Sequence, residues 1–172
     1  MSKIAVILAG CGVYDGSEVH ESVLTLLYLS QANQEVTVIA PNINQMHVIN
    51  HVNGEVMNEN RNVLIESARI ARGPVLNIAD ANPTDYDAII IPGGFGAAKN
   101  LCDFAVKGAE SSLNEDTKSF LRSFHKLHKP IGAICIAPAL LAILNSDLKN
   151  NFELSWLGIF ISQILRIINA LS

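Results

Sequence analysis

The residue best suited to covalent chemistry in this sequence is Cys135, which lies between a short apolar stretch and the start of a helical pattern. Residues 131–134 read Ile-Gly-Ala-Ile, as in a short buried strand, and Pro138 suits the first turn of a helix, where its missing N–H is not needed. A cysteine on such a tight turn corresponds to a nucleophile elbow, in which backbone N–H groups point at the reactive atom. The helix N-terminus also favours the thiolate. The alternative is a structural cysteine packed in the core.

A second stretch, residues 92–96 (Pro-Gly-Gly-Phe-Gly), can supply the polar groups that such a nucleophile needs. It follows the apolar run 88–91, which indicates a central parallel strand. Gly93 and Gly94 leave unobstructed backbone N–H groups at the carboxyl edge of the sheet, where open α/β folds place their sites. These N–H groups could stabilise an oxyanion, although a sharp turn that requires glycine is the alternative. Together, the two motifs favour nucleophilic catalysis more strongly than either one alone.

Apolar runs alternate with helical periodicity along the chain, and this alternation predicts the scaffold that holds the two motifs. Strands are expected at residues 3–9, 35–40, 75–78, 88–91 and 131–134, the third of them at an edge of the sheet. Helices are expected at residues 17–31 (capped by Ser17), 59–70, 114–128 and 138 to about 145, with a helical turn at 97–101 and a long surface loop at 104–113. The order of these elements predicts an α/β fold, a three-layer sandwich around a mostly parallel sheet.

The composition indicates a globular domain and excludes several classes of function. The chain has 172 residues, of which 49% are hydrophobic, so it can bury a substantial core. A formal net charge of −4 argues against nucleic acid as a partner. The cysteines (Cys11, Cys102 and Cys135) lie far apart and without CxxC spacing, which argues against a disulfide framework or a zinc knuckle. We therefore expect a cytoplasmic protein, and we find no targeting peptide at the N-terminus.

Two further motifs resemble cofactor sites but lack residues that such sites need. The glycine-rich loop at residues 10–16 has GxGxxxG spacing instead of GxGxxG, and the acidic residue of a dinucleotide site is missing. His47 and His51 are four residues apart and could share a helix face, but no carboxylate completes a metal-ligand set. We expect the two histidines to pack a loop, and we predict neither a metal nor a cofactor.

The C-terminal stretch, residues 146–172, differs in character from the rest of the chain. Its apolar run from Trp156 is interrupted by Gln163 and Arg166, so it is too short and too polar to predict a membrane span. We expect residues 1–145 to form the α/β domain and residues 146–172 to form an atypical tail, with no membrane as a partner.

Four stretches, residues 10–27, 40–73, 91–108 and 129–141, together resemble the ElbB group. That group comprises isoprenoid-biosynthesis-associated, amidotransferase-like proteins within the PfpI / class I glutamine amidotransferase-like superfamily. The resemblance covers nearly all of residues 1–145 and implies a flavodoxin-like fold and a homodimer. It also implies a cofactor-independent glyoxalase that converts glyoxal to glycolate, with methylglyoxal to lactate as a further conversion. A link to isoprenoid biosynthesis is implied only as physiological context.

The resemblance assigns roles to individual residues. Cys135 matches the elbow cysteine of the superfamily. The oxyanion-hole and substrate-binding positions correspond to Gly93, Gly94 and Ile136. The acidic residue that touches the thiol best matches Glu21, with Glu18, one turn earlier, as the alternative. Many relatives carry histidine directly after the cysteine, where this chain has Ile136, so neither a Cys–His dyad nor glutaminase chemistry is expected.

The expected reaction is addition of Cys135 to a small 2-oxoaldehyde, with Glu21 as the general acid–base and backbone N–H groups holding the alkoxide. Two other readings remain open. Cys135 could be a redox sensor that is oxidised to a sulfenic or sulfinic acid. The tail, which does not resemble the corresponding family region, could instead mark a truncated or frameshifted relative without activity.

Overall fold

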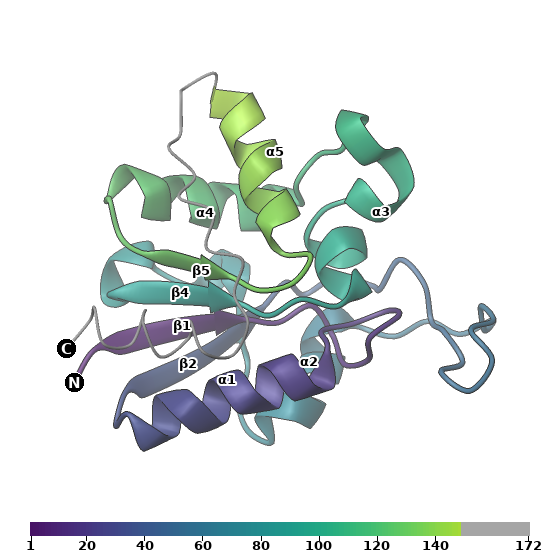
Figure 1. Cartoon of the computed structure of the whole chain (residues 1–172), viewed down its shortest axis with the longest axis horizontal. Coiled ribbons are helices and arrows are strands. Elements are labelled where there is room, and N and C mark those ends of the chain that lie inside the picture. Colours follow the sequence, from purple (N-terminus) through teal and green to yellow (C-terminus); the bar gives the residue numbers. More distant parts are fainter. Residues whose placement is uncertain (149–172) are drawn as a thin grey trace.

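The computed structural model describes residues 1–148, which form a parallel sheet between two layers of helices (Figure 1). The strands are β1 (Lys3–Ile7), β2 (Glu35–Ala40), β3 (Leu76–Asn77), β4 (Ala88–Ile91) and β5 (Ile131–Ala133). They lie in the order β3-β2-β1-β4-β5, and every neighbouring pair is parallel. The prediction of a flavodoxin-like α/β fold is confirmed.

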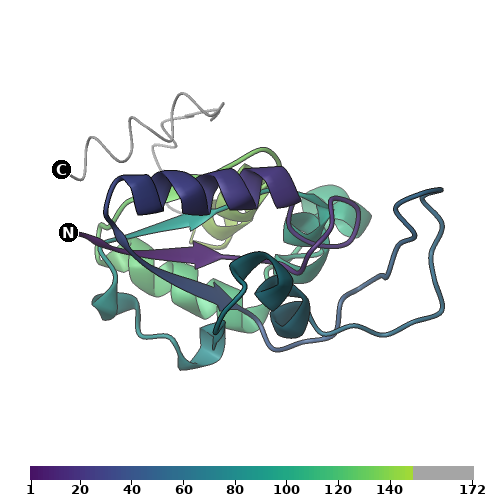
Figure 2. The same cartoon turned by 90° about the horizontal axis from the view of Figure 1, so that it is seen from below.

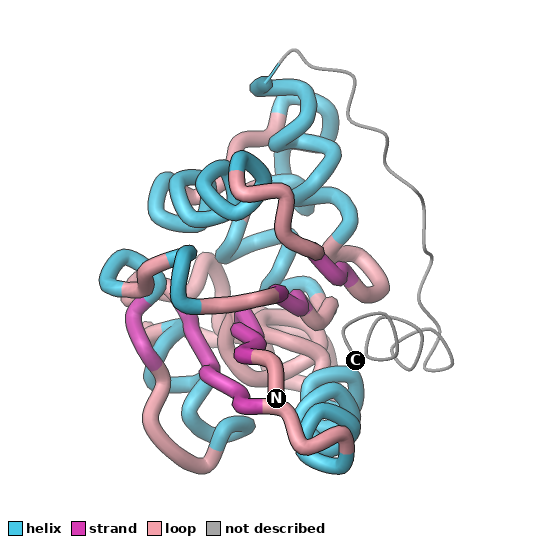
Figure 3. The backbone as a smooth tube through the Cα atoms, turned by 90° about the vertical axis from the view of Figure 1, so that its left-hand side faces the viewer, coloured by secondary structure: helices cyan, strands magenta, loops and turns pink. Residues whose placement is uncertain are grey.

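Alternate side chains of the central strands point to opposite faces, and each face is covered by its own helices (Figures 1 and 3). Helices α1 (Val19–Gln31) and α2 (Val63–Ala71) cover one face, and α4 (Glu115–Lys126) and α5 (Pro138–Leu148) cover the other. The first face buries Ile4, Val6, Leu8, Leu29, Ile70 and Ile90. The second buries, among others, Ala5, Ile7, Ile89, Ile91, Phe120, Leu121, Phe124, Leu140 and Leu144. This arrangement brings the carboxyl ends of β4 and β5 to one edge of the sheet.

The expected surface loop at residues 104–113 is wrong in part, because the segment contains the short helix α3 (Phe104–Lys107) and a 3₁₀ turn at Gly108–Glu110. The Asp103 carboxylate organises this segment: it accepts a hydrogen bond from the Ser112 backbone N–H (2.6 Å) and pairs with Lys107 (2.7 Å). These polar contacts hold the segment in a helical conformation, although its sequence has no apolar periodicity that would predict a helix. The helical turn predicted at residues 97–101 is confirmed.

The predicted cap of the first helix is also wrong. The helix begins at Val19, and its N-cap is Glu18, whose carboxylate accepts a hydrogen bond from the Glu21 backbone N–H. Ser17 is used elsewhere, because its hydroxyl oxygen accepts a hydrogen bond from Ala9 N–H at 2.8 Å.

Other helix ends differ from expectation by a few residues. Helix α2 begins at Val63, four residues later than expected, with Asn62 as its cap. Helix α5 continues to Leu148, past the expected domain boundary at residue 145. The predicted tail comprises residues 146–172: residues 146–148 belong to α5, and the remainder, including the apolar run from Trp156, lies outside the described residues.

The chain between β2 and α2 extends away from the sheet (Figures 1 and 2). Two isolated antiparallel bridges, Asn44 with Asn62 and Ile49 with Val56, hold this projecting segment together. Across residues 1–148, none of the helices combines the length and apolar character that crossing a membrane requires.

Candidate active site

Cys135 lies on a sharp turn directly after β5. The Ile134 N–H donates to the Ile91 carbonyl at 3.0 Å, which continues the sheet pairing to the residue before the cysteine. Cys135 itself has φ of 56°, a left-handed conformation that costs a non-glycine residue free energy. Helix α5 then begins at Pro138, so the cysteine sits at the elbow that the sequence predicted.

Three polar groups surround the Cys135 sulfur. The backbone N–H groups of Ile136 and Gly94 donate hydrogen bonds to it, and the Glu21 carboxyl group shares a hydrogen bond with it. Ile136 lies in the turn between β5 and α5, Gly94 in the loop after β4, and Glu21 in the first turn of α1. The fold therefore brings together Cys135, Glu21, Gly94 and Ile136, as the sequence predicted; their roles in catalysis remain proposals.

The surroundings raise the pKa of the Cys135 thiol. Partial burial of the sulfur is the largest cause, followed by the negative charge of Glu21 and its hydrogen bond to the thiol. The N–H donors of Ile136 and Gly94 act in the opposite direction but do not outweigh these effects. The backbone N–H groups at the helix N-terminus thus lower the pKa of the thiol, as expected, but burial and Glu21 outweigh them and the net direction is upward.

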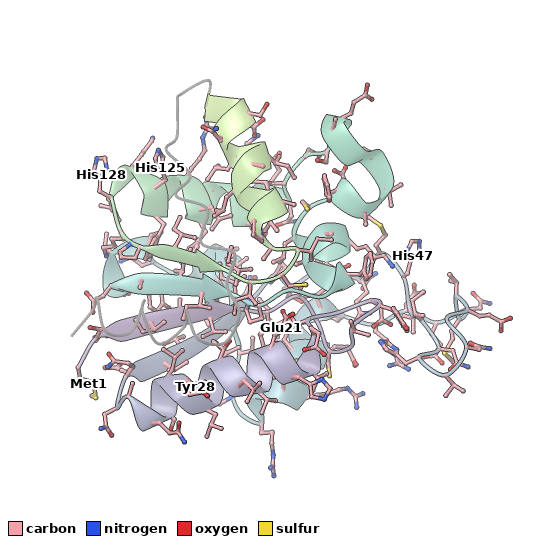
Figure 4. The ribbon with its side chains drawn as sticks, in the orientation of Figure 1. Met1, Glu21, Tyr28, His47, His125 and His128 are labelled. Carbon is pink, nitrogen blue, oxygen red and sulfur yellow. The ribbon has the colours of Figure 1, made fainter. Side chains whose placement is uncertain are left out.

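Glu21 is held in place from the loop after β4. Its Oε2 accepts a hydrogen bond from the Gly93 backbone N–H at 2.8 Å. Figure 4 shows Glu21 at the start of α1, near the carboxyl ends of the strands. Glu18, the alternative acidic residue, is occupied as the helix cap and by a contact of its Oε1 with His20 Nδ1 (2.9 Å). The structure thus places Glu21, and not Glu18, against the thiol.

The loop at residues 93–96 lies so close to the residues around it that side chains cannot fit at Gly93 or Gly94. A Cβ at Gly93 would lie 2.6 Å from the Cys135 Cβ and 2.8 Å from Glu21 Oε2. Gly94 has φ of 90°, and a Cβ there would overlap the backbone of residues 16–18. The Gly93 carbonyl also accepts the Glu18 N–H at 2.9 Å. Gly93 therefore positions Glu21 through its N–H, while Gly94 donates to the sulfur.

A cavity of about 550 Å³ opens beside Cys135, between α5 and the segment at residues 104–111. Its lining residues are Phe104, Gly108, Ala109, Ser111, Cys135, Ile136, Pro138, Ala139, Ala142, Ile143, Ser146 and Asp147. Sequence reasoning missed this wall. Six of its members lie on α5, between Pro138 and Asp147, and follow the spacing of one helix face that continues from the elbow; that periodicity was the available signal.

Sequence reasoning also missed the residue that joins the loops behind the site. Asn100 is buried, and its side-chain amide donates to the carbonyl oxygens of Ala9 (2.9 Å) and Asp15 (3.0 Å). Its Oδ1 accepts from Met46 N–H at 2.9 Å. Asn100 therefore ties the projecting segment and the glycine-rich loop to the helical turn at residues 97–101. A single asparagine in a helical turn gave no sequence signal for this role.

The two histidines of the projecting segment lie apart from the thiol. The His51 ring accepts the Tyr14 N–H through Nε2 (3.2 Å) and stacks at a tilt with Tyr14, with centroids 5.0 Å apart. His51 thus packs this segment against the glycine-rich loop, and Figure 4 shows His47 near the base of the projection. In the described part of the chain, no group of three or more His, Cys, Asp and Glu residues is arranged to hold a metal ion.

This constellation on this fold defines a cysteine-elbow α/β protein, and comparison with known sequences gives the family. The chain belongs to the DJ-1/PfpI family, whose sequence profile matches residues 3–151. A solved structure from Ehrlichia chaffeensis, an isoprenoid biosynthesis protein with an amidotransferase-like domain, superimposes with a TM-score of 0.80 at 43% identity. That match covers 85% of this chain and 69% of the other.

Curated relatives are found in animals. The ES1 protein homolog, mitochondrial, of Rattus norvegicus is 51% identical over 142 residues, which is 82% of this chain and 53% of the relative. The human glutamine amidotransferase-like class 1 domain-containing protein 3, mitochondrial, is 50% identical over the same length and coverage. The chain thus spans about half the length of the curated relatives it matches.

The expectation of a cytoplasmic location is contradicted, because these relatives are named as mitochondrial proteins. Three widely spaced, unpaired cysteines indicate a reducing environment but not which compartment provides it.

Proposed function

We propose that the chain is a cofactor-independent glyoxalase of the ElbB type, which converts glyoxal or methylglyoxal to the corresponding 2-hydroxy acid. The observation that carries this proposal is the position of the Cys135 sulfur, within hydrogen-bonding reach of one carboxyl group and two backbone N–H donors. A nucleophile, an acid–base group and an oxyanion hole are the groups that addition to an aldehyde requires. The 43% identity to the Ehrlichia protein supports the ElbB-type assignment.

Because the pKa of the Cys135 thiol is raised, the first step requires a base, and Glu21 is the carboxyl group in position to act as one. Because the resting thiol is protonated, Glu21 accepts the thiol proton as the sulfur forms its bond to the aldehyde carbon. The carbonyl π electrons move to oxygen, which the N–H groups of Gly94 and Ile136 stabilise until that oxygen is protonated, giving a hemithioacetal.

The remaining steps move protons and then add water. Glu21 removes the proton from the former aldehyde carbon, and a proton is returned to the neighbouring carbon, so that the hemithioacetal becomes a 2-hydroxy thioester. Water then attacks the thioester, the carbon–sulfur bond breaks, and the thiol recovers its proton. The net change is addition of one water molecule to the 2-oxoaldehyde, and no step requires an external oxidant or reductant.

Formation of glycolate from glyoxal, and of lactate from methylglyoxal, should be measured without glutathione. We expect the native sequence to be active and Cys135→Ala to be inactive, while Cys11→Ala, a change of the same type away from the elbow, retains activity. Circular dichroism should show that all three proteins are folded. Activity retained in Cys135→Ala would refute the role of Cys135, and a folded but inactive native sequence would favour an inactive relative.

A redox sensor is the second candidate, favoured by the exposure of Cys135 within a cradle of N–H donors. After mild peroxide, mass spectrometry would find oxidation confined to Cys135 if this is correct. Comparable oxidation at Cys11 and Cys102 would count against it. The predicted homodimer and the link to isoprenoid biosynthesis stay predictions.

A further inference from the structure

The cavity beside Cys135 is larger than the simplest 2-oxoaldehydes require. Its volume of about 550 Å³ lies within the range of small-molecule sites, whereas glyoxal carries no substituent at all. Cys135 lies at one end of the cavity, and α5 continues along it to Asp147. A substrate attached through its aldehyde carbon to the sulfur would therefore direct the rest of the molecule along this wall.

The wall is mainly hydrocarbon. The apolar lining side chains are Phe104, Ala109, Ile136, Pro138, Ala139, Ala142 and Ile143. Phe104 contributes an aromatic ring, and the residue as a whole is 37% exposed, so part of this surface is accessible to a ligand. Contact with an apolar substituent would remove this surface from water, which is favourable in proportion to the area covered.

The charged groups near the cavity disfavour an anion. Among the lining residues within 1–148, the part of the chain that the structure describes, there is no lysine, arginine or histidine, and the ionisable residue at the far end is Asp147. Lys118 already pairs with the Asp147 carboxylate at 2.6 Å. At the near end, Glu21 lies against the sulfur. A carboxylate on the substrate would therefore meet acidic groups at both ends and gain no unpaired cation from the described lining residues.

We propose that this cavity binds the substituent of the 2-oxoaldehyde and selects uncharged, apolar groups, such as a phenyl or branched alkyl group, over a carboxylate. The identification of the ligand as a 2-oxoaldehyde rests on the proposed function. The selectivity itself rests on the lining of the cavity and can be tested separately.

Alkylation of Cys135 tests the selectivity without turnover. The rates for N-benzylmaleimide and N-methylmaleimide, and for iodoacetamide and iodoacetate, should be measured at Cys135 by peptide mass spectrometry. Each rate is divided by the rate for N-acetylcysteine, which removes differences in reagent reactivity. We expect the benzyl reagent to be favoured by about tenfold over the methyl reagent, and the neutral iodoacetamide to be favoured over anionic iodoacetate.

Variants that fill the cavity locate the effect. Ala142→Phe and Ala139→Phe each place a ring in the cavity. In each variant, the ratio of the benzyl rate to the methyl rate should fall to within about twofold of the ratio for N-acetylcysteine, while iodoacetamide still reacts with Cys135. Ala105→Phe is the matched control: Ala105 is exposed on α3 but does not line this cavity. It should keep the preference of the native sequence.

The outcomes separate this inference from the glyoxalase proposal. No benzyl preference in the native sequence, or a preference that survives both cavity-filling changes, would overturn the selectivity. Selective alkylation without glycolate formation would retain the apolar site and refute the glyoxalase. If both hold, kcat/KM for phenylglyoxal should exceed that for methylglyoxal, and Ala142→Phe should remove the difference.

Discussion

Glu21 and Cys135 interact directly, so a change at Glu21 should alter the ionisation of the Cys135 thiol. In Glu21→Gln, the amide oxygen can still accept the Gly93 N–H, but the negative charge that raises the Cys135 pKa is gone. The pKa of the thiol should therefore fall, and alkylation at neutral pH should become faster. Turnover should fall about 10²–10⁴-fold, because the acid–base group is lost. The pH dependence of iodoacetamide alkylation and an assay of glycolate formation measure the two effects.

The matched control for this change is Glu18→Gln, one helical turn away. The Glu18 carboxylate caps α1 and is not among the groups that shift the pKa of Cys135. Its replacement should leave the alkylation profile unchanged. The assignment of Glu21 would be wrong if both variants changed the profile equally, or if Glu21→Gln left the thiol pKa where it was.

The sequence and its family resemblance named the candidate residues that the fold brings together at Cys135, but they did not indicate the ionisation of the thiol. Cys135 and Gly94 could be proposed because a strand–cysteine–helix turn and a glycine pair have local signatures, whereas Ile136 and Glu21 were assigned through the family resemblance. Choosing between Glu18 and Glu21 required the helix start, because the two differ by one turn. The raised pKa could not be predicted, since it depends on burial and on a carboxyl group 114 positions away in the chain.

At the level of elements, the close approach of the loops at residues 10–18 and 93–96 predicts a graded response to glycine-to-alanine changes. Gly73→Ala should change the free energy of unfolding by less than about 0.5 kcal/mol, because the nearest atom to the added Cβ, the Ala71 carbonyl oxygen, is 3.8 Å away. Gly54→Ala meets open space but has φ of 79°, so strain alone should cost about 1 kcal/mol. Gly94→Ala combines positive φ with overlap and should cost more than about 3 kcal/mol.

Urea unfolding of the three variants measures this series. If Gly94→Ala were no more destabilising than Gly54→Ala, the backbone contact between the two loops would be looser than the structure indicates.

The capping of α1 illustrates why element boundaries were only partly predictable. Serine is among the preferred N-cap residues, so Ser17 was the natural expectation. In the folded protein, the Ser17 hydroxyl bonds to Ala9 N–H at the end of the first strand, and Glu18 takes over the cap. A tertiary contact thus overrode a local preference. The same applies to residues 104–113, where contacts of Asp103 create helical turns that the apolar pattern does not indicate.

At the level of the whole molecule, Cys102 should make stability depend on alkaline pH. Burial raises the pKa of the Cys102 thiol from an ordinary 9.0 to about 11. Between these values the unfolded chain releases the proton while the folded chain retains it, so stability is lost as pH rises. The loss corresponds to about 2 to 3 kcal/mol by pH 11.

Comparison of the native sequence with Cys102→Ala isolates this contribution, because the other titrating groups are common to both proteins. The difference in free energy of unfolding should be constant below pH 8 and should shrink by about 2 to 3 kcal/mol between pH 9 and 11. Parallel pH profiles would show that Cys102 ionises as readily in the folded protein as in the unfolded chain.

The fold as a whole was the most predictable level, since buried parallel strands have continuous apolar runs and their helices have a clear period. The cavity and the projecting segment at residues 41–62 were not predictable. Both depend on how segments distant in the sequence meet, as in the contacts of Asn100 with Ala9, Asp15 and Met46.

Because the backbone of Cys135 is left-handed, with φ of 56°, the residue that the proposed reaction requires is expected to lower the thermal stability of the fold. Glycine adopts this conformation readily, whereas a residue with a Cβ is strained there by about 1–2 kcal/mol. The side chain that the proposed chemistry requires is therefore not the one that the backbone prefers. Laboratory evolution for thermal survival alone would be expected to replace this cysteine with glycine, whereas selection for turnover would keep it and accept a lower Tm.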